Sequence, residues 1–383
     1  MRECHVAVIG ASSAGLFAAY LLAQEGCRVT LFDQREALGP PLRTLIVTSR
    51  LSQVLGFVPH EAVLNHIWEI ELLSQNRRTV VKLGVPDLVL ERERLIHLLA
   101  GKAQGAGVEI ELGYSFRGLE ENHGGLSLAL YERASGRMRE VKVRGLVGAD
   151  GVGSQVARVA GRADHRRAAI CQARVPLPPQ ADDHTVRVWF HKESTPFFCW
   201  LIPESRQTGV VGLVCQDQAQ ARDALEHFLD VHRFEALSFQ GAHVALYHPG
   251  RQFRIQLQGS EAFLVGDAAG QVKATTVGGV VAGLRGAQAV AGALFRNKRA
   301  KELRRLRREL GLHFFIRLLL NSFSNSDYDD LLDMVGGRAK GVLQSYSRDE
   351  LVEAFFRLLV AQPRLVPLAA RSLMRVLGGQ WRG

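Results

Sequence analysis

The sequence contains few cysteines, and their arrangement excludes two classes of structural scaffold. Five cysteines occur among 383 residues, an odd number, and no two of them are spaced as C-x-x-C. A disulfide framework and a structural zinc site both need paired or closely spaced cysteines, so we expect neither. A reducing compartment such as the cytoplasm fits these scattered thiols. The five are Cys4, Cys27, Cys171, Cys199 and Cys215.

Long apolar runs are also absent, so no membrane-spanning helix is predicted. The apolar stretches near the C-terminus, such as HFFIRLLL, are interrupted by charge well short of the roughly 20 residues that a span requires. The N-terminus passes from Met1 through Arg2 and Glu3 straight into a strand-like segment, which does not read as a signal peptide. We therefore expect a cytoplasmic location, with peripheral contact to a membrane surface as an open alternative.

The motifs of two enzyme classes are missing. The chain has no G-x-S-x-G nucleophile elbow, and its 13 histidines show no H-E-x-x-H spacing. We accordingly expect neither a hydrolase nor a bound metal ion, and we expect no nucleic-acid partner.

What the chain does contain is an ordinary globular composition with an uneven positive charge. Hydrophobic residues make up 47% and charged residues 22%, enough for one large domain with additions or for two domains. Lys and Arg total 48 against 38 Asp and Glu, and residues 296–310, RNKRAKELRRLRREL, hold a dense share of the excess. This segment indicates either a solvated helix face or a surface for anionic lipids or another polyanion.

The pattern of apolar residues divides the chain into three parts. The start reads as strand, turn, helix and strand (HVAVIG, ASSAG, LFAAYLLAQEG, CRVTLFD), which is a βαβ unit with two parallel strands. From about residue 166 to 258 the pattern changes to β-rich pieces with one helix between them, which predicts a separate sheet. A helix over 278–295 follows, and the rest is basic and helical, with a break expected at Pro363 and Pro367.

The first strand and helix are joined by a glycine-containing turn, GASSAG, from Gly10 to Gly15. In a dinucleotide fingerprint the first glycine makes the tight turn, the last lets helix pack on strand, and an acid about 20 residues on binds ribose hydroxyls. Asp33 ends the second strand, 23 residues after Gly10. Ser12 stands where the second glycine is expected, so Ser12, Ser13 and Ala14 would present their N–H groups to a phosphate.

Two later turns repeat the sequence of apolar strand, acid and small residues. Asp150 follows the strand VRGLV, and Gly266 and Asp267 follow FLV. The second turn leads to Gly278 and Gly279 at the start of a helix, whose free N–H groups favour an anionic or electron-rich ligand. One elongated ligand held by all three turns explains them better than three unrelated turns.

These motifs resemble the flavoproteins that share the fold of p-hydroxybenzoate hydroxylase, and among them the geranylgeranyl reductase family. The resemblance implies an α/β protein: a Rossmann-like FAD-binding domain with an inserted, mostly antiparallel β-sheet substrate domain and a C-terminal helical region. It places the FAD domain at 1–64, 88–165 and 252–300, the substrate domain at 65–87 and 166–251, and the helical region at 301–383. The residues that it implies at the FAD are Gly10, Ser12, Ser13, Ala14, Gly15, Asp33, Gln34, Arg92, Asp150, Gly266, Asp267, Gly278 and Gly279.

The narrower likeness to the reductases rests on GDAAGQVKATTVGGVVAGLRGA, on FFCWLIP and on the tail ELGLHFFIRLLLNSFSNSDYDDLL. FFCWLIP is similar to the family's Tyr-x-Trp-x-Phe-Pro substrate strand, which implies that Phe198, Trp200 and Pro203 contact the substrate. Three positions depart from the family pattern. Thr44 replaces a cysteine proposed to act in the chemistry, while Ala274 and Val277 replace a proline and a glycine near the flavin.

The resemblance implies an FAD-dependent reductase of isoprenoid C=C bonds in a prenylated lipid or quinone, with no assigned catalytic residue. NAD(P)H, ferredoxin or a quinol would supply electrons, since no second glycine fingerprint predicts a dedicated NAD(P)H domain. Two alternatives stay open: an aromatic monooxygenase that uses NAD(P)H and O2, and a flavin-binding protein without catalysis. The aromatics Trp189, Phe190 and Phe197 either cover an apolar substrate or pack the core of their sheet.

Overall fold

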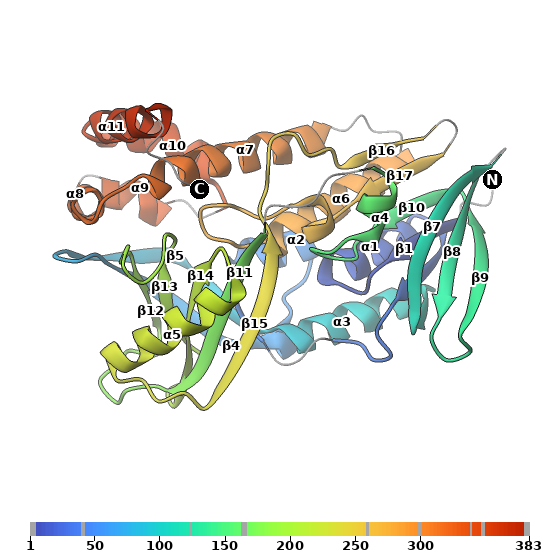
Figure 1. Ribbon diagram of the computed structural model, residues 1–383, viewed down its shortest axis with the longest axis horizontal. Helices are drawn as coiled ribbons and strands as arrows, with labels where there is room; N and C mark the ends of the chain where they lie inside the picture. Colours follow the sequence, from blue (N-terminus) through green and yellow to red (C-terminus); the bar gives the residue numbers. More distant parts are fainter. Residues whose placement is uncertain are drawn as a thin grey trace.

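A parallel sheet forms the centre of the first part of the chain (Figure 1). The computed structural model describes residues 5–39, 43–122, 125–161, 167–257, 260–296, 301–337, 339–345 and 349–378. The sheet order is β16-β17-β10-β1-β2-β6, and all neighbours are parallel except the edge pair β16 and β17. Its strands are β1 (His5–Ile9), β2 (Arg28–Asp33), β6 (Glu109–Leu112), β10 (Gly145–Gly148), β16 (Arg254–Gln256) and β17 (Glu261–Leu264).

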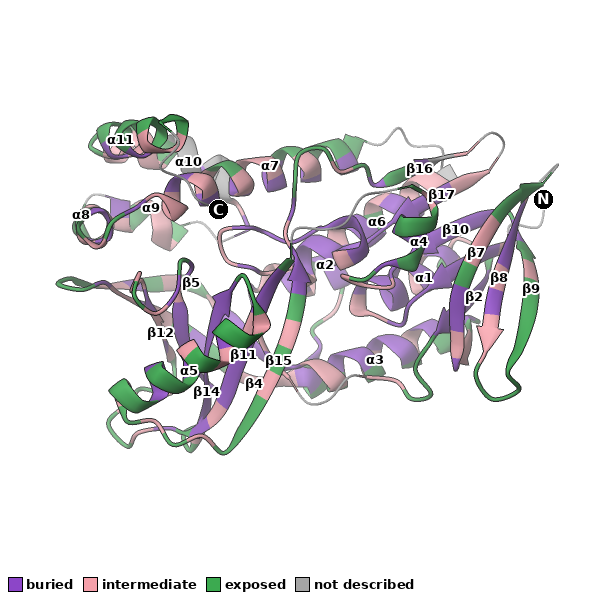
Figure 2. Ribbon diagram, viewed as in Figure 1, coloured by how far each residue is buried: buried purple, intermediate pink, exposed green. Residues whose placement is uncertain are grey.

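Both faces of this sheet are covered, which is why its strands are apolar runs rather than alternating ones. On one side helix α1 packs against both α3 and α6, and a three-stranded antiparallel sheet contacts β1, β2 and β10 (Figure 1). Figure 2 shows the resulting buried core at β1, β10, α1 and α6. The covering elements are α1 (Ser13–Gln24), α3 (Arg92–Gly105), α6 (Val280–Arg296), β7 (Tyr114–Asn122), β8 (Gly125–Glu132) and β9 (Arg137–Val143).

A second sheet has eight strands in the order β15-β11-β14-β13-β12-β4-β5-β3, antiparallel except for the pair β12 and β4. One of its faces packs on α5 (Gln218–His232), and the other lies toward the first sheet. The strands are β3 (Thr44–Val47), β4 (Val63–Leu73), β5 (Arg78–Glu91), β11 (Arg167–Pro176), β12 (Thr185–Trp189), β13 (Cys199–Pro203), β14 (Thr208–Cys215) and β15 (Ser238–Ala245).

This sheet extends past the boundaries expected for the substrate domain. Strand β3 and residues 88–91 of β5 belong to it, although the sequence assigned both to the FAD domain. The cause is the length of the β4–β5 hairpin, which reaches from the substrate sheet back to the first domain. The domain boundaries themselves therefore stay a proposal, and residues 162–166 at one of them lie outside the described part.

The C-terminal region is helical, as expected, and packs along the upper edge of the molecule in Figure 1. Leu303, Leu306 and Leu310 are buried against the core of the first sheet. Helix α10 ends just before Pro363, but Pro367 lies in the first turn of α11, where a missing N–H costs nothing, so the break expected at Pro367 is wrong. The helices are α7 (Lys301–Asn321), α8 (Asn325–Gly336), α9 (Ala339–Ser345), α10 (Leu351–Ala361) and α11 (Leu365–Leu377).

Cys27, Cys171, Cys199 and Cys215 are buried free thiols, and Cys4 lies outside the described residues. Four short helices complete the described part of the chain. The short helices are α2 (Arg50–Leu55), η1 (His60–Ala62), α4 (Gln155–Val159) and η2 (Gly266–Ala269).

Candidate cofactor and substrate site

The turn between β1 and α1 requires glycine at both ends. Gly10 has φ 110°, and a Cβ built on it would lie 2.5 Å from the Ala149 carbonyl oxygen. A Cβ on Gly15 would lie 2.1 Å from the Gly10 carbonyl oxygen and 2.8 Å from the Ala149 Cβ. No other residue fits these contacts, because the nearest atoms are backbone that cannot move aside. The turn is thus held close to the end of β10.

Ser12 shows why serine is acceptable at the second glycine position. It is the N-cap of α1: its hydroxyl accepts a hydrogen bond from the Gly15 N–H at 3.2 Å and donates to the Ala149 carbonyl at 3.1 Å. The N–H groups of Ser13 and Ala14 lie in the first turn of the helix, where no intrahelical acceptor exists. They remain available to an anionic ligand, which is favoured there by the helix dipole.

Asp33 is buried at the end of β2 and binds the same turn. Its carboxylate accepts hydrogen bonds from the Ala11 N–H at 2.6 Å and the Arg35 N–H at 2.8 Å. Each oxygen accepts one bond, which leaves further lone pairs for ligand hydroxyls. Gln34, the next residue, is exposed.

The GASSAG turn and the two turns that contain Asp150 and Asp267 lie side by side. Gly10 contacts Ala149 and the Asp150 N–H group, and a Cβ on Gly266 would lie 3.1 Å from the Ala14 Cβ. These residues follow the carboxyl ends of β1, β10 and β17, neighbours in the first sheet. The carboxyl ends of parallel strands are where open α/β sheets bind ligands.

The Asp150 side chain is occupied within the protein. Its carboxylate accepts hydrogen bonds from the Ser154 hydroxyl at 2.6 Å and from the N–H groups of Gln155 at 2.7 Å and Val156 at 3.1 Å, and so caps α4. Burial raises its pKa, while these bonds oppose the shift. A contact between Asp150 and the cofactor therefore stays a prediction. The backbone of Asp150 is better placed to make it than the side chain, which is already hydrogen-bonded.

Arginines from different segments surround Asp267. Burial raises the Asp267 pKa, and the charges of Arg43 and Arg92 oppose this. Burial also lowers the pKa of Arg92 to about 10, with Arg43 and Arg35 adding repulsion. No hydrogen bond or ion pair of the Arg43 or Arg92 guanidinium occurs within the described ranges, so these cations are available to an anionic ligand. Arg92 was predicted from the family resemblance, whereas Arg43, 49 residues earlier, was not.

The turn before α6 contains a backbone outlier. Val277 has φ 54°, a left-handed conformation that is unfavourable for a β-branched residue. The Val277 N–H donates to the Lys273 carbonyl at 2.8 Å, and the Lys273 N–H to the Gly278 carbonyl at 3.1 Å. Gly279 stands beside Asp267, because a Cβ on it would lie 3.3 Å from Asp267 Oδ1. The glycines therefore join the helix start to the acidic turn.

Phe198 and strand β13, which begins at the next residue, bring two of the predicted substrate residues near this turn. Trp200 is buried in one apolar cluster with Val277, and Phe198 packs against that cluster, its ring 5.8 Å from that of Trp200. Gly212 on β14 is required opposite Trp200, since a Cβ there would lie 2.5 Å from the indole ring. Side chains alternate along a strand, so Pro203 is on the other side, with Cys199 and Leu201. Its substrate contact remains a prediction without support from this placement.

The other aromatics of the sheet fall into separate groups. Trp189 packs on Phe228 of α5, with ring centroids 5.4 Å apart, and Phe190 stacks on Tyr328 of α8 at 4.9 Å. For these two, core packing is the better interpretation. Phe197 lies in the cluster with Trp200 and Val277.

Thr44 is committed to a buried polar chain. Its hydroxyl donates a hydrogen bond to the Glu204 carboxylate, which also binds the Arg174 guanidinium through two bonds of 2.7 and 3.0 Å. A hydroxyl whose proton is held by a carboxylate is a poor acid. Thr44 therefore links β3 to Glu204, the residue after β13, and is not placed to carry out the chemistry proposed for the family cysteine.

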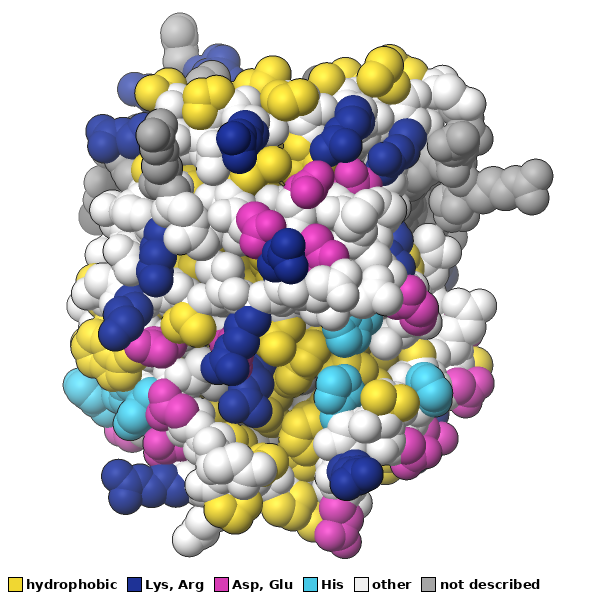
Figure 3. All heavy atoms as spheres, turned by 90° about the vertical axis from the view of Figure 1, so that its left-hand side faces the viewer, with side chains coloured by type: hydrophobic (Ala, Val, Ile, Leu, Met, Phe, Trp, Pro, Cys, Tyr) yellow, Lys and Arg dark blue, Asp and Glu magenta, His cyan; other side chains and the backbone are white. Residues whose placement is uncertain are grey.

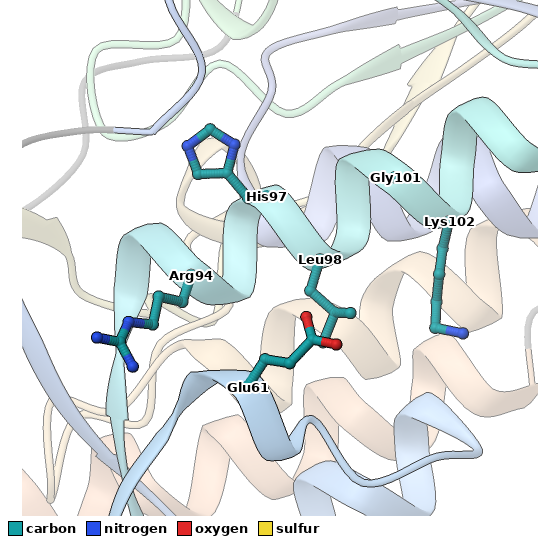
Figure 4. A pocket seen from close by; sticks show the side chains of 6 residues that line it. All are labelled: Glu61, Arg94, His97, Leu98, Gly101 and Lys102. Atoms are coloured by element: carbon teal, nitrogen blue, oxygen red, sulfur yellow. The ribbon is translucent and has the colours of Figure 1, made fainter.

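A surface hollow lies elsewhere, against α3 (Figure 4). It encloses about 590 Å³, and Figure 4 shows Glu61 from η1 pointing toward α3 between Arg94 and Lys102. None of the predicted site residues lines it. Charges of both signs and the wide opening give it no defined chemistry.

The fold and the glycine, acid and arginine arrangement define a dinucleotide-binding flavoprotein. The family described as FAD binding domain matches residues 3–299 of this chain. The chain belongs to this family, and its cofactor is FAD. The resemblance to this flavoprotein family and the expected p-hydroxybenzoate hydroxylase-like fold are both confirmed.

Curated relatives are similar over most of the chain. A digeranylgeranylglycerophospholipid reductase of Methanothermobacter thermautotrophicus is 26% identical over 87% of this chain and 90% of its own. The chloroplastic geranylgeranyl diphosphate reductase of rice is 26% identical over 71% of this chain and 62% of its own. A solved geranylgeranyl bacteriochlorophyll reductase-like protein from Thermoplasma acidophilum has a TM-score of 0.81, at 18% identity over 98% of this chain and 100% of that one. The chain is thus a member of an FAD-dependent oxidoreductase family, and it is similar to geranylgeranyl reductases.

Within the described residues, no helix has the length and apolar character to cross a bilayer.

Proposed function

We propose that this oxidoreductase reduces isoprenoid C=C double bonds of a prenylated lipid or quinone. The observation that carries the proposal is that Trp200 of β13 and Val277 of the turn before α6 belong to one buried apolar cluster. This cluster would offer an apolar aromatic surface near the turn that the flavin ring would face. The similarity to named geranylgeranyl reductases supports the same substrate class.

We propose that FAD binds across the three neighbouring turns, whose residues fit its chemical groups. Gly10 and Gly15 allow backbone to approach a pyrophosphate, the N–H groups of Ser13 and Ala14 would bind it, and Asp33 would bind the adenosine ribose. Arg43 and Arg92 would balance the phosphate charge, and Asp267 would bind the ribityl hydroxyls. Bound FAD supplies hydride transfer.

The start of α6 has an electrostatic role in this proposal. A helix N-terminus carries about +0.5 of an elementary charge, so the first turn after Gly278 and Gly279 would stabilise negative charge on the flavin. The aromatic cluster at Trp200 would exclude water from the substrate double bond.

We further propose that the enzyme takes its substrate from a membrane surface. Helix α11 has several exposed apolar side chains. Figure 3 shows apolar side chains along the top of the molecule, with basic ones beneath them. Exposed basic residues of α7 add positive charge, while residues 297–300 of the predicted basic segment lie outside the described part. The exposed apolar residues of α11 are Val366, Leu373, Met374 and Leu377.

An anaerobic assay tests the proposed reaction. Chemically reduced enzyme is mixed with a geranylgeranyl lipid, and mass spectrometry measures gain of 2 mass units per double bond, as one H2 added. Saturation without oxygen supports the proposal. Turnover only with NAD(P)H, oxygen and a phenolic ring would reject it in favour of a monooxygenase, and a reducible flavin that changes no lipid would indicate a protein without catalysis.

The electron donor is tested in the same assay. NAD(P)H, reduced ferredoxin and a quinol are each offered in place of the chemical reductant, and bleaching of the flavin absorbance identifies the donor. We propose one of these three, since the sequence holds a single dinucleotide fingerprint.

A further inference from the structure

A buried lysine belongs to the turn before α6. Lys273 is 6% exposed, and its N–H donates to the Gly278 carbonyl at 3.1 Å, which holds it at the helix start. A Cβ built on Gly278 would lie 3.5 Å from the Lys273 Cε and 3.9 Å from its Nζ. The ammonium group therefore lies beside Gly278, in the turn that the flavin ring would face in the proposed function. Lysine is almost never buried to this degree without a partner.

Asp349 is that partner, and it comes from the C-terminal region. It is 2% exposed and stands between α9 and α10, 76 residues after Lys273. One carboxylate oxygen pairs with the Lys273 ammonium, and the other accepts a hydrogen bond from the Thr48 hydroxyl. The Asp349 carbonyl accepts from Arg50 Nη1 at 3.0 Å. The contacts with Thr48 and Arg50 thus fix Asp349 against Lys273.

A buried ion pair of this kind adds little to stability on its own. Both charges lose their hydration, and apolar residues of similar volume are often as stabilising. The C-terminal region also has an apolar anchor, because Leu303, Leu306 and Leu310 of α7 are buried in the core of the first sheet. The pair between Lys273 and Asp349 therefore points to a role for its charges at the turn, beyond anchoring the C-terminal region.

Other polar groups around the turn lack partners. Thr275 binds two side chains of α7: its hydroxyl shares a hydrogen bond of 2.6 Å with His313 Nδ1, and its carbonyl accepts from Arg317 Nη2 at 2.6 Å. His313 Nε2, Arg317 Nη1 and the Thr276 hydroxyl are buried without a hydrogen-bond partner. Buried polar atoms are normally paired, so these atoms indicate a polar ligand at the turn. His313 is neutral at pH 7, because burial, with repulsion from Lys273, lowers its pKa to about 3.

We propose that the Lys273 ammonium raises the reduction potential of the bound flavin, and that Asp349 positions this ammonium and partly offsets its charge. Reduction adds negative charge to the flavin ring, which a cation fixed nearby stabilises. The lysine adds a full charge to the partial charge of about +0.5 at the start of α6. Charges in a site that excludes water act through a low effective dielectric. The inference rests on the proposed function, which places the flavin ring at this turn, and it adds the residues that set how readily the flavin accepts electrons.

The test measures the reduction potential of the FAD-loaded protein during slow reduction with a reference dye. At a fixed dye ratio, Lys273→Met is expected to lower the ratio of reduced to oxidised flavin by at least about 10-fold, equivalent to about 30 mV for a two-electron couple. Lys273→Arg keeps the charge and should stay within about threefold, while Asp349→Asn removes the opposing charge and should raise the ratio at least about fivefold. Arg375→Met, which breaks an ion pair with Asp327 elsewhere in the C-terminal region, is the matched control and should leave the ratio within about twofold.

Opposite shifts in the two single variants separate an electrostatic role from a structural one, because general loosening of the turn would move both in the same direction. An unchanged ratio in Lys273→Met and in Asp349→Asn, or a shift of the same sign in both, overturns the inference. If Lys273→Met does not retain FAD, the sign of the shift in the isosteric Asp349→Asn decides alone. Opposite shifts with no prenyl lipid reduced by the wild type support the role of Lys273 and reject the reductase. Reduction of the lipid without these shifts overturns only the role of Lys273.

Discussion

Gly15 lies so close to Gly10 that a Cβ built on it would come within 2.1 Å of the Gly10 carbonyl oxygen. Gly15→Ala should therefore open the turn between β1 and α1 and weaken FAD binding by at least about 10-fold, or about 1.4 kcal/mol. Flavin fluorescence during titration of the apoprotein measures this. Gly101→Ala on α3 is the control, because a Cβ there meets no atom within 4 Å. Unchanged affinity in Gly15→Ala would contradict the assignment.

Arg43 and Arg92 are half-buried cations near Asp267, and no ion pair joins either of them to it within the described residues. Arg43→Met should weaken FAD binding by about 10-fold or more, while the free energy of unfolding of the apoprotein stays equal or rises, because a partly buried charge without an ion pair is removed. Opposite signs in the two measurements distinguish a cofactor-binding arginine from a structural one. Arg94→Met is the control, because Arg94 lies two residues after Arg92 and its side chain is 59% exposed. A parallel loss of stability and affinity in Arg43→Met would count against the idea.

The left-handed backbone at Val277 predicts that Val277→Gly is more stable than Val277→Ala, the reverse of the usual order. Alanine normally stabilises a position relative to glycine by roughly 0.5–1 kcal/mol in regular structure. At φ 54° a Cβ costs about 1–2 kcal/mol, so Val277→Gly should be the more stable variant by about 1 kcal/mol. Urea unfolding of both variants checks this, with Val272→Ala and Val272→Gly as the matched pair in the same cluster. The ordinary order at both positions would show that Val277 is not strained.

His313 predicts a dependence of stability on pH. Burial, with repulsion from Lys273, lowers its pKa to about 3 from an ordinary value of 6.5. Between these values the unfolded chain binds a proton that the folded chain does not, so the free energy of unfolding falls as the pH is lowered, by at most about 1.4 kcal/mol per unit. Above about pH 7 this group has no effect. His313→Gln should lose this slope, and parallel pH profiles for the two proteins would refute the prediction.

The apolar row on α11 predicts binding to anionic vesicles. Met374→Glu and Leu377→Glu together should lower partitioning to phosphatidylglycerol vesicles by at least about 10-fold, because exposed apolar contacts are lost and negative charge is added. Sedimentation with vesicles measures the bound fraction. Val231→Glu on α5, where Val231 is 63% exposed, controls for a change at a distant apolar residue. Equal partitioning of all three proteins would rule out α11 as the contact.

The sequence predicted the elements whose signal is local. The strand, GASSAG turn and acid of the first βαβ unit define a dinucleotide site over 24 residues, and the structure brings Gly10 and Asp33 together through Ala11. The helix start at Gly278 and Gly279 was predicted for the same reason. Alternation along FFCWLIP separates Trp200 from Pro203, and that alternation is readable from sequence although it was not applied.

What the sequence could not show depends on contacts between distant segments. The charge of Arg43 acts on Asp267 only because the fold brings these distant residues near each other, and the Asp150 carboxylate caps α4. His313 and Arg317 look like ordinary residues of an amphipathic helix, and only the fold places them against Thr275. Their unsatisfied atoms are a property of packing, for which a single sequence carries no pattern.

The account depends most directly on one FAD spanning the three turns. The measurement that tests it is a crystal structure of the protein with FAD. We predict continuous density from Asp33, past Gly10 and Arg43, to the flavin ring at Gly278 and Gly279 beside Val277. A protein that cannot be loaded with FAD, or density in which the ring lies away from Val277 and Trp200, would contradict it.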